Sequence, residues 1–200
     1  MQRYPKYLKM IAEKFLKLLT SESKKLKNKE IFDIVIYGSS VKGKRKINDI
    51  DIIFIFNNFP LEKRLEITQK FKSKINLKNL DIKSINLKEL FDKTFLARQG
   101  IILEGISLLD GKPFSKKLGF EGFTLFTYNT SKLSNTEKVK LTFALNGRRE
   151  EKGLITKLDS KKLGNGKILV PIRNSNLFLE FLETRNIEFK LEQLLIAKYK

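Results

Sequence analysis

Residues 34–56 read IVIYGSSVKGKRKINDIDIIFIF, and this stretch decides the fold of the chain. A short apolar segment runs into Gly38 and Ser39, a basic loop follows, and Asp49 and Asp51 then open a second segment that is almost entirely apolar. Short runs rich in β-branched and aromatic residues, separated by a turn, are typical of buried strands. The stretch therefore predicts two strands joined by a loop that carries glycine, hydroxyl, lysine and carboxylate groups.

The spacing of the two acids has a chemical meaning. Side chains of a strand alternate between its faces, so Asp49 and Asp51 share one side. Two neighbouring carboxylates repel each other unless a cation lies between them, and such a pair suits Mg²⁺. Gly38 has no side chain to keep a ligand away, and the Ser39 hydroxyl with the following backbone N–H groups can face phosphate oxygens. These groups together favour a site for a metal-bound triphosphate.

The order Gly38-Ser39, then Lys42-Gly43, then residues 48–51 (NDID) resembles the signature of the nucleotidyltransferases of the DNA polymerase beta-like superfamily, in its minimal prokaryotic type. The resemblance implies that a Gly-Ser pair holds the nucleotide triphosphate and that the two acids bind two divalent metals. It also implies a third carboxylate on a neighbouring strand, for which residues 80–85 (LDIKSI) offer Asp81. Asn48 departs from the usual Ser or Thr of the family, and Lys42 from the frequent Arg, but neither change removes a metal ligand.

The candidate residues follow from this match. The nucleotide-binding candidates are Gly38, Ser39 and Lys42. The catalytic and metal-binding candidates are Asp49, Asp51 and Asp81, and the expected cofactor is a pair of Mg²⁺ ions, with Mn²⁺ as a substitute. Each feature alone has a plain structural interpretation, because Gly-Ser turns and Asp pairs occur in many α/β proteins and Asp81 can be a polar residue on an exposed edge.

Composition narrows the possible chemistry. The chain of 200 residues contains neither cysteine nor histidine. A disulfide framework, a thiolate zinc site, a Ser-His-Asp triad and a His-ligated metal are therefore excluded, and catalysis must depend on carboxylates, lysines, hydroxyls and bound metal. No apolar segment is long enough to span a bilayer, so we expect no membrane association and a cytoplasmic location.

The charge of the chain bears on its partners. The formal net charge is +19, which produces a positive field that attracts nucleic acid, nucleotides or an acidic partner. Lysine enrichment also arises in AT-rich genomes and at high growth temperature without any role in nucleic-acid binding. Both interpretations stay open.

Periodicity extends the prediction along the chain. The fold class that we expect is α/β (α+β), with a small mixed sheet and flanking helices of nucleotidyltransferase type in a catalytic domain, residues 1–118. A smaller C-terminal α+β domain, residues 119–200, would contact the acceptor. The expected strands of the first domain are residues 31–37, 50–56 and 80–85, and the expected helices begin near Pro5, Pro60 and Lys88, the last of them ending at Glu104.

Local signals also organise the second domain. Ser134 and Glu137 have the spacing of a capping box that opens a helix ending at Gly147, and Gly164-Asn165-Gly166 predicts a tight turn. A helix near residues 176–184 and a strand from residue 187 complete a β-α-β arrangement. The aromatic side chains within residues 120–128 can either stack on nucleic-acid bases or form a hydrophobic core.

The sequence thus predicts a metal-dependent nucleotidyltransferase that moves a nucleoside monophosphate from a nucleoside triphosphate, ATP in the first instance, to a hydroxyl group with release of pyrophosphate. RNA such as a tRNA end, an acceptor protein and a small molecule all stay open as acceptors. The alternative is a non-catalytic nucleic-acid or nucleotide binding module that keeps the fold.

Overall fold

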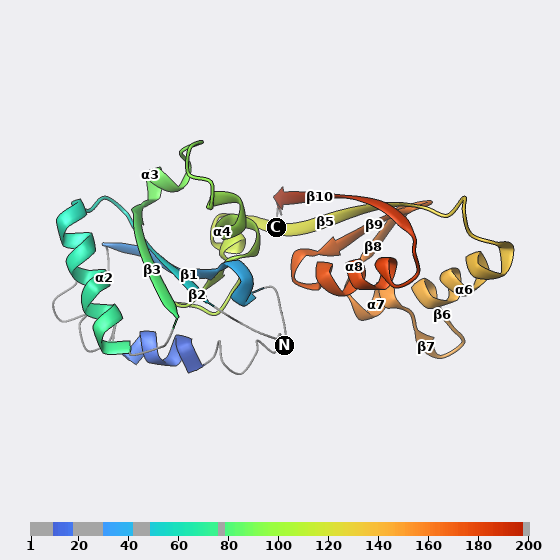
Figure 1. Ribbon diagram of the computed structural model, residues 1–200, viewed down its shortest axis with the longest axis horizontal. Coiled ribbons are helices and arrows are strands. Elements are labelled where there is room, and N and C mark those ends of the chain that lie inside the picture. Colours follow the sequence, from blue (N-terminus) through green and yellow to red (C-terminus); the bar gives the residue numbers. More distant parts are fainter. Residues whose placement is uncertain (1–9, 18–29, 42–48, 76–78, 198–200) are drawn as a thin grey trace. The chain divides into compact units, whose positions relative to one another are not determined.

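The computed structural model describes residues 10–17, 30–41, 49–75 and 79–197 (Figure 1). The chain divides into two compact units, Met1–Leu118 and Gly119–Lys200. Each unit has its own sheet and its own hydrophobic core.

The first unit contains a four-stranded mixed sheet with the order β3-β2-β1-β4. Strand β1 is antiparallel to both β2 and β4, whereas β2 and β3 are parallel. The mixed sheet confirms the predicted fold class, and three of its strands lie within one residue of their predicted positions. The strands are β1 (Ile31–Tyr37), β2 (Ile50–Phe56), β3 (Leu80–Asn86) and β4 (Ile106–Ser107).

Helices cover both faces of this sheet, because its central strands are apolar on both sides. Helix α2 (Leu61–Ile75) and the helical residues 10–17 pack on one face, where Phe54 lies beside Phe15 and Phe71. The other face carries a second core, which includes buried residues of three short helices. These are α3 (Leu87–Leu90), α4 (Arg98–Glu104) and α5 (Phe114–Lys117). The result is a helix-sheet-helix arrangement in which alternate residues of β1 and β2 enter different cores.

The single helix predicted from Lys88 to Glu104 is wrong. Two short helices, α3 and α4, take its place, and turns connect them. The Asp92 carboxylate accepts hydrogen bonds from both the backbone N–H of Thr94 (2.8 Å) and its hydroxyl (2.7 Å). Such local side-chain bonds compete with the helical pattern and end α3. Phe91, the residue after α3, is 57% exposed.

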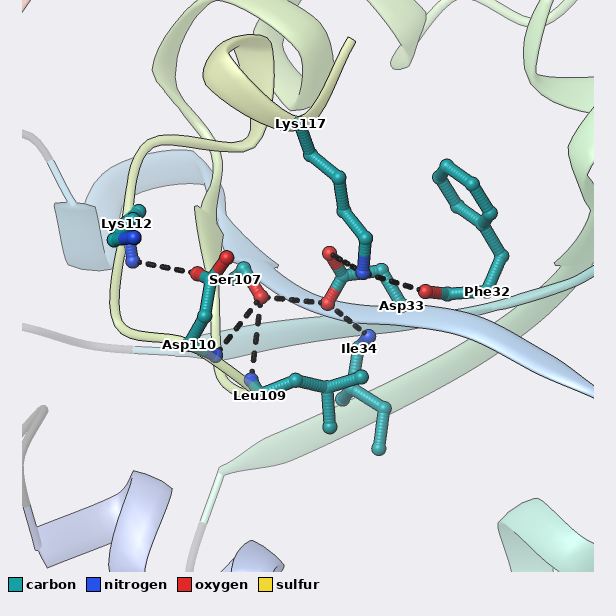
Figure 2. Close-up of polar contacts among 8 residues, drawn as sticks. All are labelled: Phe32, Asp33, Ile34, Ser107, Leu109, Asp110, Lys112 and Lys117. Atoms are coloured by element: carbon teal, nitrogen blue, oxygen red, sulfur yellow. Dashed lines mark hydrogen bonds and ion pairs between the residues drawn. The ribbon is translucent and has the colours of Figure 1, made fainter. Parts of the chain in front are cut away.

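A buried carboxylate fastens the end of the first unit to its central strand (Figure 2). Asp33 on β1 is fully buried and accepts hydrogen bonds from the Ser107 hydroxyl (2.7 Å), the Ile34 N–H (2.7 Å) and the Lys117 ammonium (2.9 Å). Lys117 also donates to the Phe32 carbonyl at 2.7 Å. Since these partners come from β1, β4 and α5, the cluster holds three elements together. Burial raises the pKa of Asp33, and the hydrogen bonds from Lys117 and Ser107 offset only part of that rise.

This raised pKa predicts how stability depends on pH. An acid with a folded pKa above its unfolded value contributes stability that is fully present below the unfolded pKa and is lost as the pH rises through the folded pKa. Asn at position 33 keeps an oxygen acceptor for Ser107 and Ile34 but cannot ionise. We therefore expect the free energy of unfolding of the wild type to fall relative to that of Asp33→Asn as the pH rises from below 3.8. Urea unfolding at pH values between about 3 and 7 measures the difference.

Asp92→Asn is the matched control for this measurement. Hydrogen bonds from Thr94 lower the pKa of Asp92, so its difference from the wild type should have the opposite sign. Parallel stability curves for the wild type and Asp33→Asn would contradict the prediction.

The second unit has the topology of a split βαβ fold. Its principal elements follow in the order β-α-β-β-α-β, and each strand is antiparallel to its neighbours in the sheet order β10-β5-β9-β8. The strands are β5 (Phe120–Asn129), β8 (Lys161–Gly164), β9 (Lys167–Pro171) and β10 (Glu188–Ala197), and the helices are α6 (Asn135–Asn146) and α8 (Ser175–Glu183). Between α6 and β8 lie the two-stranded sheet of β6 (Gly147–Arg148) and β7 (Glu151–Lys152) and the short helix α7 (Leu154–Lys157).

Local features of the second unit follow the sequence prediction. The Ser134 hydroxyl and the Glu137 carboxylate form the capping box of α6, and Gly147 ends that helix with φ +90°. Gly166 has φ +70° in the turn between β8 and β9. The aromatic residues of β5 divide between the two faces of the strand, because its residues alternate. Of these, Phe126 is fully buried against Phe178 of α8, so at this position the core interpretation is correct.

Among the described helices, none combines the length and the apolar character that a membrane crossing requires.

Candidate active site

The candidate site begins where β1 ends. Residues Gly38–Val41 form a 3-10 turn, and the Ser40 hydroxyl donates a hydrogen bond of 2.8 Å to the Tyr37 carbonyl. Gly38 has φ +75°, a conformation that favours glycine. A Cβ atom at this position would lie 2.5 Å from Oδ2 of Asp51. Gly38 is therefore required both by the backbone and by the side chain of a candidate metal ligand.

The registers of the sheet bring two of the three candidate acids, Asp51 and Asp81, to neighbouring positions. Asp51 pairs with Asp81 across the parallel strands β2 and β3, and with Tyr37 across the antiparallel strands β1 and β2. Residues that pair across neighbouring strands point to the same face. Asp49 is exposed and directly precedes β2, and Ser39 lies half-buried in the turn. Of the six predicted residues, Lys42 lies outside the described residues.

The electrostatics of Asp51 reflect this crowding of negative charge. Burial raises its pKa, and the nearby carboxylates of Asp81 and Asp49 raise it further, whereas Lys83 lowers it. A cation close to these carboxylates would relieve both the repulsion and the cost of burial. The pKa of Asp51 is thus raised, and a cation bound beside it would lower it again.

The donor chemistry fits a hard divalent cation. Carboxylate oxygens are ligands that Mg²⁺ prefers, and the three candidate acids offer nothing softer. In the conformation described, however, Oδ2 of Asp81 lies 3.3 Å from the Lys83 ammonium nitrogen. Across the part of the chain that the structure describes, no three acidic side chains are gathered closely enough to enclose a metal ion.

Two residues of the candidate site, one paired with Asp51 and one in the turn, did not emerge from the sequence. Tyr37 is 8% exposed and pairs with Asp51, but its position depends on the register between β1 and β2, which the sequence alone does not give. Burial raises the pKa of its hydroxyl, Lys83 lowers it, and Asp51 and Asp81 raise it again. Ser40 is buried and fastens the turn. Lys83 lies two residues after Asp81 on the same strand, so both side chains share one face, and the 3.3 Å contact between them agrees with this.

Comparison with protein families identifies the class. Residues 22–110 match the family model described as polymerase beta, nucleotidyltransferase. This segment includes β1, the turn, β2, β3 and all six candidate residues. The first unit is therefore a nucleotidyltransferase domain of the DNA polymerase beta-like superfamily, and the predictions of this family and of an enzyme of this class are confirmed.

Three solved structures resemble the chain at 22% sequence identity. They are a mutant MntA–HpeT toxin–antitoxin, a tri-AMPylated HEPN toxin in complex with MNT antitoxin from Shewanella oneidensis, and a toxin–antitoxin with AMP-PNP. The matches cover 54%, 56% and 54% of this chain and 78% of each of those chains, with TM-scores of 0.36, 0.36 and 0.37. No curated protein matches the chain significantly.

Proposed function

We propose that the first unit transfers AMP from ATP to a hydroxyl group of RNA or protein and releases pyrophosphate. The observation that supports this most strongly is the pairing of Asp51 with Asp81 beside the side-chain-free position of Gly38. It puts two carboxylates on one face of the sheet, next to the turn that begins at Gly38. The attacking hydroxyl oxygen forms a bond to the α-phosphorus while the bond between the α-phosphorus and the bridging oxygen breaks.

The three acids would hold the divalent cations. Asp49, Asp51 and Asp81 would bind two Mg²⁺ ions, which Mn²⁺ can replace, and these would neutralise the triphosphate and lower the pKa of the attacking hydroxyl. Asp81 is about half exposed, so an acceptor can reach it, and it would take up the proton of that hydroxyl.

The turn after β1 would hold the triphosphate. Gly38 and Ser39 present backbone N–H groups at the end of a strand, and the Ser39 hydroxyl adds a further donor. Lys42 follows directly in the sequence and would contact the phosphates as a point charge. Fixed donors at the phosphates stabilise the charge that develops when pyrophosphate leaves.

Acceptor choice belongs to the second unit in this proposal. Residues 1–118 would be the catalytic domain and residues 119–200 the domain that contacts the acceptor. The positive charge of the chain favours a polyanion such as a tRNA end, because neutralising phosphates releases counterions. A protein hydroxyl is the other acceptor, and experiment separates the two.

Transfer of label tests this function directly. The purified protein is incubated with Mg²⁺, each α-labelled nucleoside triphosphate and either bulk tRNA or a protein extract, beside the Asp49→Asn Asp51→Asn double variant. We expect label from ATP in one of the two acceptor fractions with the wild type alone. Equal labelling of the acceptors by the wild type and the double variant would contradict the proposal. So would transfer of label from another nucleoside triphosphate but not from ATP.

A further inference from the structure

One cation lies among the candidate acids. Lys83 is on β3, two residues after Asp81, so both side chains leave the same face of the strand. Its ammonium nitrogen is 3.3 Å from Oδ2 of Asp81, and the two side chains are 57% and 49% exposed. Asp81 in turn pairs with Asp51 across β3 and β2. Asp51 and Asp81 are two of the carboxylates that the proposed function gives to the metal.

An exposed ion pair of this kind adds little to the stability of the fold, because water screens it. The position of this ion pair, at a proposed metal ligand, affects metal binding instead. A divalent cation that binds Asp81 must approach the same carboxylate group that now faces the ammonium, and the two cations repel each other. The free protein therefore carries an internal competitor for the metal.

Once Lys83 no longer contacts Asp81, its ammonium group can interact with a bound nucleotide. A triphosphate together with three carboxylates carries more negative charge than two divalent ions neutralise. The flexible four-carbon stem of lysine lets the ammonium move from Asp81 toward the phosphates. An ammonium that opposes the metal in the free protein can then favour the complex of metal and triphosphate.

We propose that Lys83 is a positioning residue which holds Asp81 in the free site and moves to the triphosphate when the divalent ion binds, so that metal and nucleotide bind together. This inference depends on the proposed metal-binding role of Asp49, Asp51 and Asp81. Its distinguishing feature is thermodynamic coupling, which is reciprocal between the two ligands.

The test measures binding in place of activity. Mn²⁺ and a non-hydrolysable ATP analogue are titrated singly and together, by calorimetry, into the wild type and Lys83→Met. We expect Lys83→Met to bind Mn²⁺ alone about tenfold more tightly and the analogue, at saturating Mn²⁺, about tenfold more weakly. Lys83→Arg keeps the positive charge and should restore both affinities at least in part.

Two further variants separate the possible failures. Lys72→Met removes an exposed lysine from α2, on the opposite face of the sheet, and should change neither affinity. If Lys83→Met behaves like Lys72→Met while Asp51→Asn loses Mn²⁺ binding, the role of Lys83 is wrong and the metal site stands. If Asp51→Asn binds Mn²⁺ as the wild type does, the metal site itself is wrong, and the inference about Lys83 falls with it.

Discussion

Asp51→Asn is expected to reduce nucleotidyl transfer by a factor on the order of 10³ or more while the fold stays intact. The substitution keeps the size of the side chain but removes the charge that would hold metal beside the triphosphate, and such metal contacts contribute several kcal/mol of charge stabilisation. Removing the charge also relieves the two effects that raise the pKa of Asp51, its burial and the repulsion from Asp81 and Asp49. The variant should therefore be as stable as the wild type or more stable. Initial rates and thermal unfolding of both proteins give the two results.

Glu66→Gln supplies the control for Asp51→Asn. Glu66 is an exposed acid on α2, which packs on the face of the sheet opposite Asp51, and the change removes one negative charge in the same way. Its transfer rate should equal that of the wild type. An Asp51→Asn variant that retains more than about a tenth of the wild-type rate would remove Asp51 from the metal site.

Gly38→Ala should have the second largest effect. The added Cβ would lie 2.5 Å from Oδ2 of Asp51, so the carboxylate or the turn has to move. Displacing a metal ligand and the adjoining phosphate-binding turn by a few tenths of an ångström or more is expected to lower the transfer rate about 10²-fold. The positive φ of residue 38 adds a cost of about 1–2 kcal/mol in stability. Steady-state rates and urea unfolding measure the two effects.

Gly111→Ala separates these two contributions. Gly111 has a similar φ of +68°, but a Cβ atom there would meet nothing within 4 Å. The variant should lose a similar amount of stability and none of its activity. Equal losses of activity in Gly38→Ala and Gly111→Ala would show that strain in the backbone, and not the contact with Asp51, limits the reaction.

The sequence predicted the central strands because their signals are local. The apolar runs of β1 and β2 are short and rich in β-branched residues, and they end at Gly38 and Asn57. Strand β3 mixes apolar and polar residues but follows Asn79. Strand alternation alone also indicates that Asp49 and Asp51 share one side. The prediction of one helix over residues 88–104 was wrong because the hydrogen bonds from Thr94 to Asp92 compete with helix formation. The periodicity of apolar residues does not reveal such local hydrogen bonds.

The sequence did not predict features that depend on register and topology. To predict that Tyr37 pairs with Asp51, one must know how β1 and β2 align. To predict the sheet order β10-β5-β9-β8, one must know which strands distant in the sequence pair with each other. For Gly38, the expected reason was access for a ligand. In the structure Asp51 occupies the space where a Cβ would lie, so the glycine also makes room for an acid thirteen residues later.

The most direct measurement for the central claim follows two phosphorus atoms of ATP. The wild-type protein is incubated with Mg²⁺, RNA and protein acceptors, and ATP labelled at either the α or the γ position. Nucleotidyl transfer puts the α label on the acceptor and the γ label in free pyrophosphate, and this is the result that we predict. The γ label on the acceptor would indicate phosphoryl transfer, and acceptors without either label would indicate a domain that binds nucleotide without this reaction; either result would contradict the proposed function.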